Sequence, residues 1–195
     1  SFGYSMTDML TMGMKGDFGM LTLPALSALP FAAQALHEIK SGAIRPAVFR
    51  TGRKNWIIGK VAGCVISGML LQGAAVGLLF LILNGLMRGY AGQWFPWGDG
   101  GDFWPMLLRR MLCVGIWAGV GCIIALATET ASAAYLAPLC LCYALMMIGT
   151  RFFPDVAMLN PMQWVNGAAW LLVVLLIITI ALQALFLKQG VQRYA

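Results

Sequence analysis

Charged residues are scarce in this sequence. Of its 195 residues only 10% are Asp, Glu, Lys or Arg, whereas 61% are apolar on a count that leaves out 23 glycines. A soluble globular domain carries about 25% charged residues. The scarcity excludes an ordinary soluble protein, and the length favours a single membrane-embedded domain over residues 1–195.

Residues that perform catalysis are also nearly missing. His37 is the only histidine, and the chain has no HExxH pattern, no pair of intramembrane aspartates and no serine flanked by glycines. An active site needs convergent groups of these kinds. We therefore predict no catalytic residue, no cofactor site and no enzymatic activity in the chain itself.

Recognisable metal-binding patterns are missing as well. The five cysteines form no CxxC pair and lie inside apolar stretches, which is typical of packing residues in membrane helices. They are Cys64, Cys113, Cys122, Cys140 and Cys142. We predict no metal site among them.

The first seventeen residues are rich in methionine, with Met6, Met9, Met12 and Met14. Thioethers suit Cu(I), but flexible apolar packing at a membrane surface explains them more simply, so copper binding is kept only as the alternative. Ser5 and Asp8 have the spacing of a capping box, and Gly13 is a helix-stop residue. We expect a short interfacial helix here.

Long apolar stretches dominate the rest of the chain. About 20 apolar residues are needed to cross the hydrocarbon layer as a helix. We predict an all-α polytopic bundle with five spans, at residues 18–36, 56–87, 106–127, 131–149 and 165–187. Two glycine pairs at i, i+4 favour close helix packing, Gly73 with Gly77 and Gly115 with Gly119.

The basic residues indicate the topology. Five spans place the two termini on opposite sides, and the side richer in Lys and Arg is cytoplasmic. Eight of the 13 lie on one side: Lys40, Arg45, Arg50, Arg53, Lys54, Lys60, Lys188 and Arg193. We expect a multi-pass plasma-membrane protein with its N-terminus outside and its C-terminus in the cytoplasm. The net charge of +6 then reflects topology and contact with lipid, and predicts no nucleic-acid partner.

Few polar side chains fall inside the spans, and none of the strongest candidates is charged. The amides of Gln72, Asn84 and Gln183 are candidates to line a transport pathway. The alternative, which we favour for each, is that the amide satisfies a neighbouring helix.

The cytoplasmic loop over residues 37–55 is the most informative segment. Gly42 is suited to end the preceding helix, Pro46 to a helical first turn, Gly52 to end a short helix and Asn55 to cap the next span. A helix of one or two turns is predicted between two spans. Its sequence places Phe49 among cationic residues, as expected of a protein-docking helix or of a loop held by anionic lipid heads.

In order along the chain, Glu38, the pair Ser41-Gly42, the basic stretch at residues 50–54 and Lys60 resemble the membrane subunits of ATP-binding-cassette (ABC) exporters of the type-2 kind. The small permeases of Gram-positive bacteria are particularly similar. Members of that family have six spans and start inside. The resemblance therefore implies a missing N-terminal span, which fits a chain that begins with Ser1.

The resemblance implies a permease that pairs with a second, identical or related permease subunit and with separate ATPase subunits that bind ATP and Mg²⁺. It assigns transmission of motion to Glu38, paired with Arg45 or another cation. It assigns coupling and docking to Ile44, Arg45, Val48, Phe49, Arg50, Arg53 and Lys54. The alternatives are a structural or assembly subunit of a membrane complex and an intramembrane enzyme.

Overall fold

The computed structural model describes residues 5–16, 24, 25, 27, 33–91, 98, 101–154, 156, 159–167 and 169–194. Within these residues all regular structure is helical. Most of the first predicted span, residues 18–36, lies outside the described residues. Its last residues fall in α3 (Gln34–Lys40).

Four helices are long and apolar enough to cross a membrane. They are α5 (Arg53–Ala91), α6 (Phe103–Thr128), α7 (Ala131–Arg151) and α9 (Ala169–Tyr194). The central helix is α6, which packs against the other three and is the most buried. The protein is therefore a helical multi-pass membrane bundle, as the sequence predicts.

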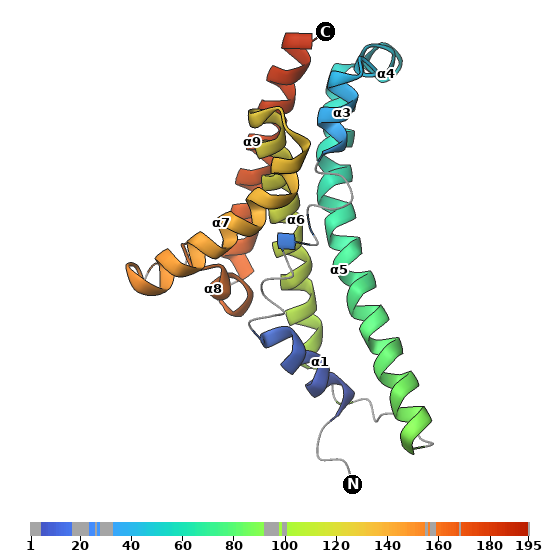
Figure 1. Ribbon diagram of the computed structural model, residues 1–195, viewed down its shortest axis with the longest axis vertical. Coiled ribbons are helices and arrows are strands. Elements are labelled where there is room, and N and C mark those ends of the chain that lie inside the picture. Colours follow the sequence, from blue (N-terminus) through green and yellow to red (C-terminus); the bar gives the residue numbers. More distant parts are fainter. Residues whose placement is uncertain are drawn as a thin grey trace.

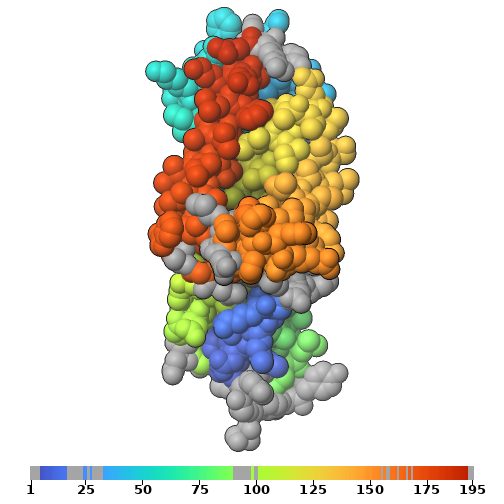
Figure 2. Space-filling view, turned by 90° about the vertical axis from the view of Figure 1, so that its left-hand side faces the viewer, coloured from blue at the N-terminus to red at the C-terminus, as the bar shows by residue number. Residues whose placement is uncertain are grey.

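Shorter helices mark the two ends of the bundle (Figure 1). At one end lie α3, α4 (Ile44–Thr51) and the C-terminal turns of α9; this is called the α4 end. At the opposite end α1 (Met6–Lys15) packs beside the start of α6, and this is called the α1 end. Figure 2 shows α1 covering this end below the level of α7. Between α7 and α9, α8 (Pro161–Asn166) packs against α6.

Several helix boundaries differ from those predicted. Val165 belongs to α8, so the last span begins only at Ala169. Asn55 lies inside the first turn of α5, which starts at Arg53, and so does not cap it. Gly13 lies within α1, and the helix ends at Gly16.

The core falls into two clusters along α6. At the α1 end, Trp117 stacks on Trp164 of α8 with ring centroids 5.6 Å apart, among apolar side chains from α1, α5, α7 and α9. At the α4 end, Trp56, Cys64, Cys122 and Leu187 pack with side chains of α3 and α4. The second cluster fixes the two short helices to the bundle.

The predicted close packing at Gly115 and Gly119 is confirmed. A Cβ at Gly115 would lie 3.1 Å from Val65 of α5, and one at Gly119 would lie 2.5 Å from the Thr179 methyl group of α9. By contrast, Gly77 faces open space. The glycines of α6 therefore allow α5 and α9 to approach it closely, whereas the glycine pair of α5 serves no such contact at Gly77.

Candidate functional site

The candidate site is built on α4, the helix predicted between two spans. Gly42 and Gly52 on either side of it have φ values of +75° and +78°, which residues with a Cβ rarely adopt. Pro46 occupies the first turn, where its missing N–H costs nothing. The backbone N–H of Gly52 donates to the Val48 carbonyl and closes the helix. The sequence therefore sets both ends of α4 locally.

The two apolar faces of α4 have different surroundings. Ile44 is completely buried in the cluster at the α4 end, and Val48 is half-buried against it. Phe49 points away from the chain and is 93% exposed. Ile44 therefore anchors α4 and has no surface to offer to a partner, whereas Phe49 is fully available.

Cationic side chains surround Phe49. Arg45, Arg50, Arg53 and Lys54 are all exposed, and α4 itself contains no acidic residue. Arg53 also donates to the carbonyl of Lys188 on α9 at 3.5 Å. The exposed face of α4 is thus one aromatic ring within a patch of positive charge, which we call the Phe49 patch.

Behind the patch, Glu38 joins α3 to α5. Its Oε1 lies 2.5 Å from Nζ of Lys60, and the two side chains are 26% and 23% exposed. Gln34 donates to the same oxygen at 3.3 Å, and the Lys60 ammonium lies 6.0 Å from the ring of Trp56. The cation that Glu38 pairs with among the described residues is therefore Lys60; Arg45 is exposed on α4.

A second contact ties α3 to the central helix. Lys40 donates through Nζ to the backbone carbonyl of Glu129 at 2.5 Å. Glu129 ends α6 with a φ of +55°, the left-handed conformation that terminates a helix. Consequently α3 is connected both to α5 and to the turn between α6 and α7.

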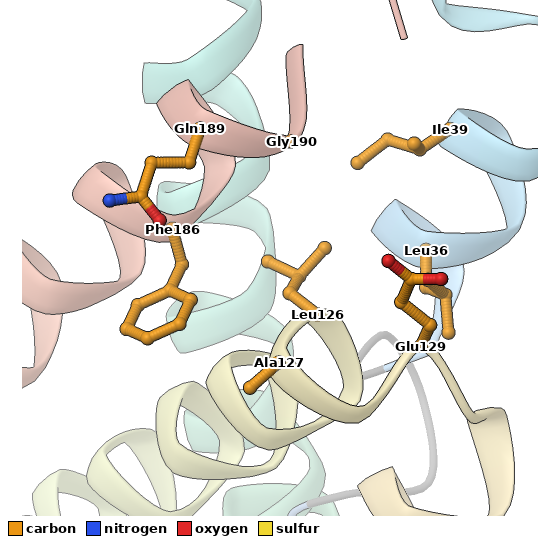
Figure 3. Close-up of a pocket in the computed structure, with 8 residues that line it drawn as sticks. All are labelled: Leu36, Ile39, Leu126, Ala127, Glu129, Phe186, Gln189 and Gly190. Atoms are coloured by element: carbon orange, nitrogen blue, oxygen red, sulfur yellow. The ribbon is translucent and has the colours of Figure 1, made fainter. Parts of the chain in front are cut away.

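A small cavity of about 150 Å³ lies beside this connection. Figure 3 shows Leu126 and Glu129 between Leu36 and Ile39 of α3 on one side and α9 on the other. The cavity leaves α3 incompletely packed against α6 and α9.

The three predicted pathway amides do not converge. Gln72 and Asn84 are both buried on α5 but twelve residues apart, which is about 18 Å along a helix. Asn84 donates to the carbonyl of Phe80 on its own helix. Gln183 is completely buried on α9 near the α4 end. No single polar site is formed by these three residues.

The methionines of α1 also diverge. The predicted capping box is present: Ser5 and Asp8 exchange hydrogen bonds at the start of the helix. Met6 and Met14 are buried in the core, whereas Met9 and Met12 are 44% and 63% exposed. The four thioethers therefore do not face a common point, and two of them serve packing.

Arg110 is a buried cation with a structural role that the sequence did not predict. It is 1% exposed on α6 and donates to the backbone carbonyl of Met14, near the end of α1. The C-terminal carbonyls of a helix carry partial negative charge, so the guanidinium stabilises this end. The sequence does contain a signal for this role: Arg110 lies four residues inside the predicted span at residues 106–127, and a cation inside a span usually has a specific partner.

Comparison with protein-family models, with curated proteins and with solved structures finds no match to this chain.

Proposed function

We propose that this chain is the membrane permease subunit of an ATP-driven exporter of the ABC type, and that α4 docks a separate ATPase subunit in the cytoplasm. The observation that supports this most is the Phe49 patch. An exposed aromatic ring beside arginines is the combination enriched in protein interfaces and their energetic centres. The sequence resemblance around Glu38 and Lys60 points to the same role.

Coupling in this proposal runs through the contacts behind the patch. A partner that closes on ATP pushes α4 at Phe49. Because Ile44 anchors α4 and Glu38 is paired with Lys60, the push reaches α3 and α5 together. The hydrogen bond from Lys40 to the Glu129 carbonyl transmits the same displacement to the end of α6. The helices then tilt, and substrate moves outward.

The chain supplies half of the translocation pathway and a second permease subunit supplies the other half. Gln72, Asn84 and Gln183 are buried at separate levels of the single chain. They are candidates to line the pathway because separation of the helices would expose their amides to it. ATP and Mg²⁺ are held by the ATPase subunits.

The test is co-purification of the tagged chain with an ABC-type ATPase from the membranes of its native host. The tagged chain should elute with the ATPase in detergent. Arg50→Glu should reduce the amount retained at least tenfold, because it replaces a positive charge beside Phe49 with a negative one and removes the charge complementarity proposed for the interface. The matched control is Arg151→Glu, which reverses an exposed charge at the far end of α7 and should leave retention unchanged.

Two outcomes would contradict the proposal. One is a well-folded chain that retains no ATPase, which would favour a structural or assembly subunit. The other is equal retention by the Arg50 and Arg151 variants, which would leave α4 as a lipid-contacting loop.

A further inference from the structure

Two thiols from different helices meet inside the bundle, toward the α4 end. Sγ of Cys64 on α5 lies 3.4 Å from the carbonyl oxygen of Ala118 on α6. In an α-helix that carbonyl accepts the N–H of the residue four positions later, which is Cys122. Cys64 and Cys122 belong to the same buried cluster, line the same cavity and are 3% and 1% exposed.

An amide with unmet hydrogen-bonding capacity lies beside the two thiols. Gln183 of α9 is 0% exposed, and its Nε2 and Oε1 atoms make no hydrogen bond of normal geometry within the described part of the chain. The amide adjoins both thiols and lies against α6 at Gly119. A fully buried amide without a partner is uncommon and points to a missing ligand, ion or water.

A route to the thiols exists from the α4 end. A cavity of about 330 Å³ reaches Cys64 and Cys122 and is lined on its other side by α3 and the start of α5, including Trp56 and Lys60. The site therefore combines two soft donors, an amide donor and an entry path.

We propose that Cys64 and Cys122 form a binding site for one soft monovalent metal ion, Cu(I). Thiolates select Cu(I) over the hard cations, and two thiolates on opposite sides satisfy this ion in a linear arrangement. Two S–H bonds break and two S–Cu bonds form, the two protons pass to solvent, and the copper stays in the +1 state. No electron is transferred.

The surroundings suit the bound form. Two thiolates and one Cu(I) carry a net charge of −1, which is costly in a membrane interior without compensation. The Gln183 Nε2 has two N–H groups available for the thiolate sulfurs. Groups of this kind typically change metal affinity about 10- to 100-fold. A bound metal ion thus accounts for the buried Gln183 amide that lacks a hydrogen-bond partner, which packing alone does not explain.

A second thiol pair provides an internal control. Cys113 of α6 and Cys142 of α7 are also buried and belong to one apolar cluster. This cluster is the one at the α1 end, and neither thiol lines the cavity described above. Removing this pair deletes as many thiols as removing Cys64 and Cys122.

The experiment titrates the purified full chain with Cu(I) under reducing, oxygen-free conditions against a chromogenic Cu(I) chelator. The expected result is one Cu(I) per chain, absent in Cys64→Ala and in Cys122→Ala and retained in the double variant Cys113→Ala with Cys142→Ala. Gln183→Leu should weaken binding about 10- to 100-fold without abolishing it. Equal binding by all cysteine variants, or none by the wild-type chain, would overturn the proposal.

A measurement on the wild-type chain keeps the test valid if a variant fails to fold. Bound Cu(I) should protect two thiols from alkylation, and mass spectrometry should map them to Cys64 and Cys122. Protection of Cys113 and Cys142 instead would contradict the assignment. Neither readout depends on ATPase coupling, so the outcome is independent of the proposed transport function.

Discussion

Glu38 and Lys60 form the contact on which the proposed coupling depends most. Each side chain is about three-quarters shielded from solvent, so their pairing lies between a surface ion pair and a buried one. Surface pairs contribute about 0–1 kcal/mol, whereas breaking a buried pair costs roughly 3–5 kcal/mol. Removing one partner therefore leaves a partly buried charge that the bundle does not solvate well.

The first prediction concerns this pair. Glu38→Gln and Lys60→Gln should each lower the unfolding free energy, and the double variant should lose less than the sum of the two. A coupling free energy of about 1 kcal/mol is expected from the double-mutant cycle, measured by unfolding in detergent. Additive losses would show that the two charges do not act on one another.

Gly119 shows how a single missing Cβ positions a helix. The Thr179 methyl group lies 2.5 Å from the position that this Cβ would take, and the Thr179 hydroxyl donates to the Leu175 carbonyl at 2.8 Å, which fixes its rotamer. An added methyl group at Gly119 therefore displaces α9 or breaks this hydrogen bond.

The second prediction follows from that contact. Gly119→Ala should destabilise the bundle by about 1–3 kcal/mol, the usual cost of overpacking. Gly77→Ala is the control, since it meets open space and should be neutral or stabilising by up to about 1 kcal/mol. Thermal unfolding of both variants measures the difference, and equal melting temperatures would contradict the packing described.

At the scale of elements, α4 is a short helix whose position depends on the turns beside it. Gly52 has φ +78° and ψ 148°, a conformation that glycine adopts readily and other residues do not. An alanine there forces the turn between α4 and α5 into a different conformation. That change would move Phe49 relative to Glu38.

The third prediction tests this turn. Gly52→Ala should cost on the order of 1–3 kcal/mol in the local stability of α4. Hydrogen exchange should show faster exchange of the amides at residues 48–52. Gly59→Ala, inside α5 with nothing near its Cβ, is the matched control and should slow exchange or leave it unchanged. Unchanged exchange in the Gly52 variant would contradict the strained turn.

The helix α1 depends on its capping box. The pKa of Asp8 is held below its usual range, because Oγ of Ser5 donates to its carboxylate at 2.6 Å and the Ser5 backbone N–H donates at 3.0 Å. A depressed pKa in the folded state means that this stabilisation is present above the ordinary pKa of Asp. It is lost as the pH falls through the lowered value.

The fourth prediction applies this sign. In Ser5→Ala the pKa of Asp8 should rise toward its ordinary value, followed by NMR titration of the carboxyl group, and the first turn of α1 should exchange its amides faster. Thr11→Val is the control, because the Thr11 hydroxyl donates to the Asp8 backbone carbonyl and not to the carboxylate. The same rise in both variants would refute the capping role.

Local rules account for what could be predicted from the sequence. Apolar length predicted the four described spans, Gly42 predicted the end of α3, Gly52 the end of α4, and Ser5 with Asp8 the start of α1. Each depends on residues close together in the chain. Such features are decided before the helices pack.

Features set by packing could not be predicted in this way. Gly13 does not end α1, because burial of Met14 against α6 and the hydrogen bond from Arg110 outweigh a helix penalty of about 1 kcal/mol for glycine. Likewise, the cation beside Glu38 depends on how α3 lies against α5. The meeting of two thiols from α5 and α6 likewise depends on helix register.

At the scale of the whole molecule, α6 is the central helix, and the helices around it differ in how much of their surface is buried. The most apolar part of α6 is 56% buried, against 22% for α5 and 17% for α7. The less buried helices expose apolar faces to lipid or to a second subunit. In the proposed coupling, a push on α4 is expected to displace α3 and α5 more than α6.

The most direct measurement of the central claim is ATP hydrolysis by the chain reconstituted with the proposed ATPase partner in lipid nanodiscs. The fifth prediction is that Phe49→Ala lowers the stimulated rate at least tenfold, because the ring is the most exposed apolar group of the proposed docking helix. Phe152→Ala, which removes another exposed ring at the end of α7, should keep the wild-type rate. Full stimulated hydrolysis in a folded Phe49→Ala chain would contradict the account.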